Sequence, residues 1–171
     1  KGIEIEYDMP KNGIMFKDSN LEKVIRKALG IPIKLLKKED LAKLAKLEAD
    51  NEKISDLTAL EHCTNLEVLY LNSNQISNIR PLANANLVKL TELYLNKNQL
   101  IDLSGLASAD LSKLTGLYLA NNQLTGLKGL ANAKLSNLTS LHLNNNRLKD
   151  LSGLANVNLP KLTKLTLSNN Q

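Results

Sequence analysis

The chain has 171 residues, enough to bury one apolar core, and 43% of them are hydrophobic. Its net charge of +5 favours acidic partners in general, but the 22 Lys and Arg residues are scattered, which argues against nucleic-acid binding. The single cysteine, Cys63, excludes an intrachain disulfide, and no apolar stretch approaches the ~20 residues that a membrane-spanning helix needs.

Residues 1–43 carry no repeat, and we predict that they form an N-terminal cap of one edge strand and two helices. IEIEY, at 3–7, alternates like an edge strand, and the start of the chain lacks the apolar run of a signal peptide. DSNLEKVIRKALG predicts a helix in which Ser19 and Glu22 have capping-box spacing and Gly30 ends the helix. KKEDLAKL predicts a second, shorter helix.

Residues 44–171 form a repeat array. LYLNSNQI, at 69–76, returns every 24 residues as LYLNKNQL, LYLANNQL and LHLNNNRL, and LTLSNNQ closes the chain. With the residues before it, each copy fits L-x-x-L-x-L-x-x-N-x-L, the pattern of leucine-rich repeats. Residues 44–65 are a variant first unit of 22 residues, and the last unit is truncated. We expect cap and array to form one structural domain.

Alternation of the two strand leucines predicts a short strand in each unit, with both leucines facing inward. One strand per unit gives a parallel sheet, and the aliphatic residues downstream cover its inner face. About seven aliphatic side chains per unit then build a core by stacking, so no unit is expected to fold alone. The predicted fold class is α/β: a leucine-rich-repeat solenoid with a small N-terminal α-helical cap.

Polar positions inside the repeat also have a structural interpretation. An Asn amide offers two donors and one acceptor, so it can satisfy backbone groups in the turn after each strand and bridge to the next unit. Cys63 falls in the column of Leu87 and Leu111, which predicts a buried apolar residue; a reactive thiol is the alternative. The asparagines concerned are Asn74, Asn98, Asn122, Asn146 and Asn170.

The repeats and the cap sequence together resemble bacterial internalin-type leucine-rich-repeat proteins over residues 16–171. The resemblance implies a curved, right-handed coil with the parallel sheet on its concave face and irregular or helical segments on its convex face. It also implies display at the bacterial surface or secretion, and binding of another protein. The 24-residue units are longer than the usual ~22 residues of that family, and its C-terminal cap and wall anchor are absent.

The candidate partner-binding residues face away from the core. Three of the four tyrosines and one histidine share the position between the strand leucines. This column is either a stacking ladder that stabilises the strands or an amphipathic strip that anchors a partner. Flanking polar columns either form a binding floor or keep the sheet soluble, and the last units turn basic through His142, Arg147 and Lys164. The candidates are Tyr70, Tyr94, Tyr118, His142, Asn72, Asn96, Asn144, Gln75, Gln99, Gln123, Arg147 and Glu92.

Catalysis, a cofactor and a metal site are not predicted. His62 and His142 lie in unrelated columns, and no phosphate loop, catalytic serine motif or Cys/His cluster occurs. We predict a non-enzymatic module that binds an unidentified protein through the concave face, without nucleic acid or membrane insertion, and that is extracellular or at the cell surface.

Two alternatives stay open: a cytoplasmic leucine-rich-repeat scaffold or regulatory subunit, and an engineered or regularised repeat protein without a natural ligand. The chain ends inside a unit at Gln171, which leaves an apolar edge. That edge predicts either a piece of a longer array or end-to-end self-association.

Overall fold

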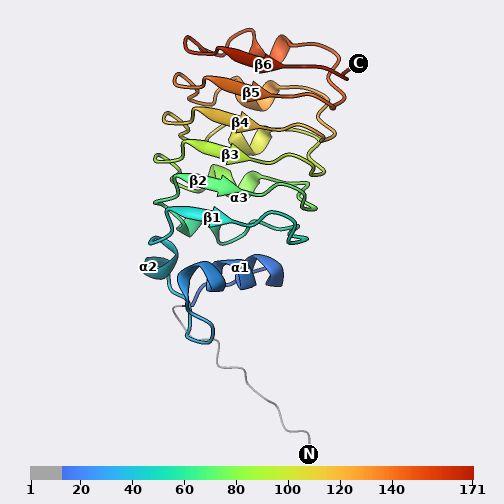
Figure 1. Cartoon of the computed structure of the whole chain (residues 1–171). Coiled ribbons are helices and arrows are strands. Elements are labelled where there is room, and N and C mark those ends of the chain that lie inside the picture. Colours follow the sequence, from blue (N-terminus) through green and yellow to red (C-terminus); the bar gives the residue numbers. More distant parts are fainter. Residues whose placement is uncertain (1–12) are drawn as a thin grey trace, which may run out of the picture.

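The elements follow one another in a simple order in the computed structural model, which describes residues 13–171 (Figure 1). The edge strand expected at 3–7 lies outside the described residues. The strands are β1 Lys46–Glu48, β2 Val68–Tyr70, β3 Glu92–Tyr94, β4 Gly116–Tyr118, β5 Ser140–His142 and β6 Lys164–Thr166. The helices are α1 Ser19–Leu29, α2 Lys38–Leu41 and α3 Arg80–Ala83, with 3-10 helices η1 Leu60–His62, η2 Ser104–Leu106, η3 Lys128–Leu130 and η4 Ser152–Leu154.

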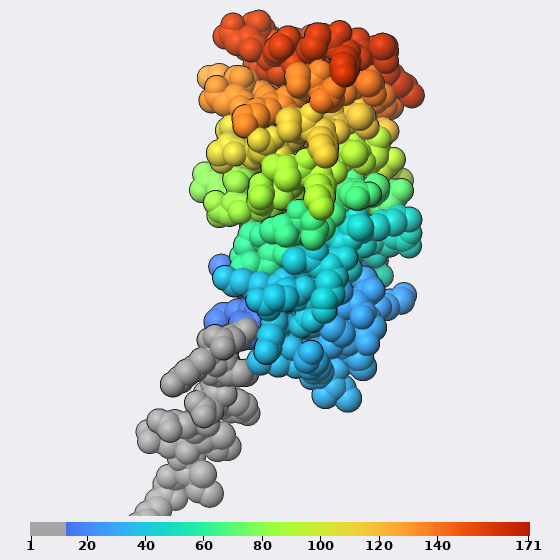
Figure 2. Space-filling model, turned by 90° about the vertical axis from the view of Figure 1, so that its left-hand side faces the viewer, coloured from blue at the N-terminus to red at the C-terminus, as the bar shows by residue number. Residues whose placement is uncertain are grey.

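The six strands form one parallel sheet, in which each strand pairs with the next one along the chain. The register joins equivalent positions of successive units, so that Leu69 lies beside Leu93 and Tyr70 beside Tyr94. The same register holds at every other junction. The predicted sheet, with one strand per unit, is confirmed. Figure 2 shows the units stacked in sequence order along an elongated body.

The core is a continuous column of aliphatic side chains enclosed by the stacked units. Leu69 and Leu71 of the β2 unit are fully buried, as are Ile76 and Leu82 downstream of them. In the units of β1 to β5, short helices at equivalent positions lie on the side opposite the sheet, as predicted. At the β6 end Leu165 is 39% exposed, because no unit within residues 13–171 covers it.

The asparagine column holds adjacent units together. Asn98 Oδ1 accepts a hydrogen bond of 3.0 Å from the backbone N–H of Ile76 in the preceding unit. Its Nδ2 donates to the carbonyl oxygens of Leu71, at 2.8 Å, and Leu95, at 3.2 Å. One amide thus satisfies three buried backbone groups that would otherwise be unpaired. The predicted structural role is confirmed, because the equivalent asparagines repeat these contacts.

Asp18, and not Ser19, caps helix α1, which corrects the predicted start of that helix. The Asp18 carboxylate accepts from the backbone N–H groups of Asn20, at 2.9 Å, and Leu21, at 3.0 Å. Its second oxygen accepts from the backbone N–H groups of Ser55, at 2.7 Å, and Asp56, at 3.2 Å, in the first repeat unit. A carboxylate accepts hydrogen bonds from several N–H groups better than a hydroxyl does, so the cap moves one residue earlier.

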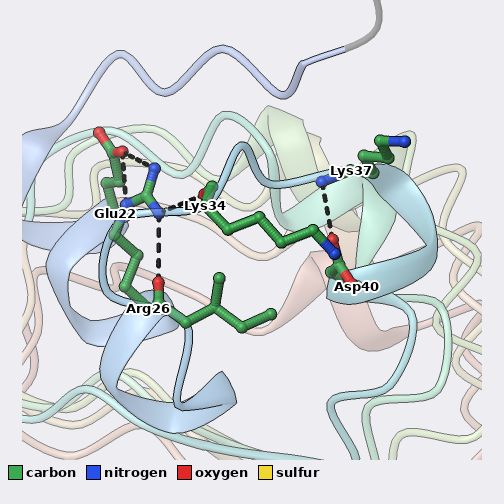
Figure 3. Close-up of polar contacts among 6 residues, drawn as sticks. Glu22, Arg26, Lys34, Lys37 and Asp40 are labelled. Atoms are coloured by element: carbon green, nitrogen blue, oxygen red, sulfur yellow. Dashed lines mark hydrogen bonds and ion pairs between the residues drawn. The ribbon is translucent and has the colours of Figure 1, made fainter.

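Polar contacts fix the rest of the cap, as Figure 3 shows. Arg26 pairs with Glu22 at 2.8 Å and donates to the carbonyl oxygen of Lys34 at 2.9 Å, which ties α1 to the loop that follows it. Asp40 accepts from the backbone N–H of Lys37 at 3.1 Å and caps α2. Gly30 ends α1 with a φ of 65°, as predicted, because this left-handed conformation strains residues that carry a Cβ.

Candidate protein-binding face

The aromatic column forms a continuous stack across the outward-facing side of the sheet, here called the concave face. The ring centroids of Tyr70 and Tyr94 are 4.6 Å apart, and those of Tyr94 and Tyr118 are 4.3 Å apart. His142 extends the stack at 5.0 Å from Tyr118. The in-register parallel strands place one ring directly beside the next, so the predicted stacking ladder is confirmed.

The stack determines what the tyrosines can offer a partner. Each face of the Tyr94 ring lies against a neighbouring ring, and Lys46 Nζ lies 5.3 Å from the Tyr70 ring centroid. The ring faces are therefore already occupied within the protein. The Tyr118 hydroxyl lies 2.8 Å from where a Cβ of Gly116 would stand, so it faces the sheet beside Glu92, and the half-buried rings turn their edges to the outside. A row of aromatic ring edges at strand spacing offers apolar contact along a bound chain.

Glu92 lies beside this ladder in a space that a glycine leaves open. Its Oε1 accepts from Thr115 Oγ at 2.8 Å. Its Oε2 is buried and has no hydrogen-bond partner among residues 13–171. A Cβ at Gly116 would overlap Oε2, so the absence of a side chain there lets the carboxylate fold down onto the sheet. Burial raises the pKa of Tyr118, and so do the neighbouring Tyr94 hydroxyl and the Glu92 charge.

The flanking asparagine column has a structural role that the sequence did not indicate. Asn72 Oδ1 accepts from the backbone N–H of Asn96 at 3.0 Å, and Asn96 Oδ1 accepts from that of Ala120 at 2.8 Å. Asn144 Oδ1 accepts from Thr166 Oγ at 3.0 Å. The side-chain oxygens of these predicted binding residues thus bridge successive units.

The glutamine column follows the strands and borders the concave face. The backbone N–H of Gln75 donates to Ile54 O at 2.8 Å, and that of Gln99 donates to Ile76 O at 2.9 Å. These bonds hold each residue beside the preceding unit. The side chains of Gln75, Gln99 and Arg147 are exposed, and Gln123 is half-buried. Of the twelve predicted residues, Tyr70, Glu92, Tyr94, Tyr118 and His142 lie in the strands, and the asparagines, glutamines and Arg147 follow the strands in the chain.

Charge is distributed unequally along the face. The first unit carries Glu48, Asp50 and Glu52 beside a hollow of about 410 Å³, whose lining also includes Lys27 and Lys46. Among these groups, Lys46 pairs with Glu48 at 2.5 Å. The outward-facing positions of β4, β5 and β6 carry no carboxylate; β6 carries Lys164 instead.

The surroundings of the histidine on this face favour its neutral form. Burial lowers the pKa of His142, and the positive charge of Lys164 lowers it further. The positive charge at the β6 end of the face therefore comes from Lys164 and from Arg147 at its border, which is exposed.

Within residues 13–171 no group of three or more His, Cys, Asp or Glu side chains could hold a metal ion. None of the helices described there is long and apolar enough to cross a membrane. Cys63 is fully buried, as predicted, and burial raises the pKa of its thiol to about 12.

Sequence comparison places the chain in a known family. The family described as Leucine rich repeat matches residues 42–100 and 64–124, and that described as Leucine Rich repeats (2 copies) matches residues 112–156 and 136–171. No curated protein sequence matches significantly. The chain therefore belongs to the leucine-rich-repeat family.

Solved structures refine this assignment. An internalin (inlF) from Listeria monocytogenes matches with a TM-score of 0.80 and 37% identity, over 91% of this chain and 44% of that chain. The functional domain of InlJ from the same organism matches with a TM-score of 0.59 and 28% identity, over 91% and 37%. The secreted internalin-like protein Lmo2445, also from Listeria monocytogenes, has a TM-score of 0.75 at 21% identity, over 95% and 60%, and shows the fold alone.

The repeats are of the internalin type, a fold that serves as a protein-interaction module. The chain spans less than half the length of the internalin F chain that it matches.

Proposed function

We propose that this protein is a non-enzymatic binding module that holds another protein on its concave face, outside the cell or at the cell surface. The observation that carries the proposal is the stacked ladder of Tyr70, Tyr94, Tyr118 and His142, which lies at the centre of an exposed sheet. Stacking fixes the rings before a partner arrives, so little side-chain entropy is lost on binding. The internalin-type fold supports both the interaction role and the location.

The test compares two surfaces of the same molecule. The chain is immobilised and incubated with a protein mixture, and the retained proteins are identified. The concave variant carries Tyr70→Ala, Tyr94→Ala and Tyr118→Ala. The control variant carries Arg80→Ala, Lys128→Ala and Ser152→Ala in the helices opposite the sheet. Retention that the control keeps and the concave variant loses supports the proposal, provided that circular dichroism shows both variants folded. Equal retention by both variants contradicts it.

We further propose that the 171-residue polypeptide associates with itself through the β6 end. Leu151 is 40% exposed and Leu165 39% exposed there, while α1 and α2 cover the other end of the stack (Figure 1). When the β6 ends of two chains meet face to face, each covers the same surface of the other, so the expected species is a closed dimer. Sedimentation analysis should show a monomer–dimer equilibrium that Leu165→Lys shifts to monomer. A monomer at every concentration would refute this association.

A further inference from the structure

The two ends of the concave face differ in the charges that a bound chain would meet. At the β1 end, Glu48 and Asp50 occupy outward positions. At the β6 end the corresponding positions carry the neutral Thr166 and Ser168, and the exposed Lys164 occupies the position that Lys46 holds in β1. A polypeptide lying across the strands therefore meets an anionic environment at one end and a cationic one at the other.

The cations at the β6 end are available to a partner. Lys46 at the β1 end is paired with Glu48, whereas Lys164 and Arg147 form no ion pair within residues 13–171. Both side chains are exposed. Lys164 pairs with Ser140 in the strand register, so it lies beside the strand that carries His142. This cationic end therefore continues directly into the aromatic ladder.

We propose that the concave face binds an extended acidic segment of the partner protein, with its carboxylates at Lys164 and Arg147 and its remaining length along the edges of the tyrosine rings. This inference rests on the proposed function, because it names the partner chemistry of the same face. Four strand spacings of about 4.8 Å separate Tyr70 from Thr166, so this part of the face is about 19 Å long. About six extended residues span that distance.

Charge also sets the position of the segment on the face. Glu48 and Asp50 repel carboxylates at the β1 end, while Lys164 attracts them at the β6 end. The Glu92 carboxylate is folded against the sheet and held by Thr115, which keeps its charge near β3 and β4. An acidic segment is therefore held over β5 and β6, and one that is shifted toward β1 meets like charge.

The experiment uses hexaglutamate as the probe and hexalysine as its charge-reversed counterpart. Each peptide is titrated into the ¹⁵N-labelled 171-residue chain at low ionic strength, and the backbone amide shifts are followed by NMR. We expect saturable shifts with hexaglutamate, concentrated in Ser140–His142 and Lys164–Thr166. We expect no shifts in those strands with hexalysine.

Matched double variants test whether these two cations bind the peptide. R147Q/K164Q removes one Arg and one Lys from the proposed site, and R80Q/K128Q removes one of each from the opposite side, so both variants keep the same net charge. Hexaglutamate should bind the first variant about tenfold more weakly than the unmodified chain, and the second within about twofold. Equal weakening of both variants would overturn the inference, because it would show attraction by net charge alone.

The failure of this inference differs from the failure of the proposed function. If hexaglutamate causes no shifts in β5 and β6 while the concave variant still loses a captured protein, the acidic-segment inference is wrong and the binding face stands. If neither result appears, both are wrong. Hexalysine shifts in β5 and β6 that match those of hexaglutamate would also refute the inference.

Discussion

The rings of Tyr94 and Tyr118 lie parallel within 2°, with their centroids 4.3 Å apart. Tyr94 also stacks on Tyr70, so it has a tyrosine on each side. The parallel register of β2, β3 and β4 imposes this arrangement, because equivalent residues of successive units lie side by side. The same column thus stabilises the sheet and forms the centre of the proposed binding face.

Replacing Tyr94 with alanine should lower the free energy of unfolding by about 2 kcal/mol. Two aromatic contacts are lost, each worth about 0.5–1.5 kcal/mol. Tyr94→Phe keeps both contacts and should stay within about 0.5 kcal/mol of the unmodified protein. Urea unfolding followed by circular dichroism measures both variants. If Tyr94→Ala were as stable as Tyr94→Phe, the stack would contribute nothing to stability.

Asn98→Ala should lower the free energy of unfolding more than Tyr94→Ala does, by about 3 kcal/mol or more. The substitution leaves the buried N–H of Ile76 and the carbonyl oxygen of Leu71 without their partner. Asn86→Ala is the matched control, because Asn86 is exposed on a loop. Thermal and urea unfolding should show this loss of stability for Asn98→Ala and not for Asn86→Ala. Similar stability of the two variants would contradict the role assigned to the asparagine column.

Two glycines provide a direct test of how closely the units stack. A Cβ at Gly129 would overlap the backbone carbonyl of Leu103, whereas a Cβ at Gly126 would meet nothing within 4 Å. Gly129→Ala should therefore destabilise the protein by about 1–3 kcal/mol, since backbone atoms cannot rotate away. Gly126→Ala should be neutral or slightly stabilising. The difference in urea midpoint measures the effect, and equal midpoints would refute it.

Asp18 should make stability depend on acidic pH. Burial by itself would raise its pKa, but the backbone hydrogen bonds from Ser55, Leu21 and Asp56 lower the pKa below 3.8. The stabilisation is therefore complete above pH 3.8 and is lost as the pH falls through the lower pKa of the folded state. Asp18→Ala should cost about 2 kcal/mol at pH 7.

The control for this prediction is the pH profile itself. The difference in unfolding free energy between the unmodified protein and Asp18→Ala should shrink as the pH is lowered from 5 toward 2. A difference that stays constant over this range would show that the Asp18 charge does not join the cap to the first unit.

Cys63 should resist alkylation in the folded protein. Its thiol is fully buried with a pKa of about 12, so little thiolate exists at pH 8. Iodoacetamide should leave the folded chain unmodified by mass spectrometry and should add one group after denaturation in guanidinium chloride. Rapid modification of the folded chain would contradict the burial of this residue.

Much of the fold follows from the period of the sequence. In a stack of similar units, a residue contacts its equivalent 24 positions later, so the repeat itself encodes long-range contacts. The leucine columns, the parallel register, the asparagine contacts and the burial of Cys63 were predicted for this reason. The twelve candidate binding residues were likewise placed on one face by their position in the repeat.

Features that do not recur from one repeat unit to the next were decided by the tertiary structure. Asp18 and Ser55 are 37 residues apart and belong to different kinds of element, so no spacing in the sequence links them. The fold of Glu92 over Gly116 depends on two different residues being adjacent across strands. Sequence therefore determined the stack, because identical units can pack in register in only one way. The tertiary structure decided the junction with the cap, the occupied tyrosine faces and the exposed cations, because these depend on where unlike side chains meet.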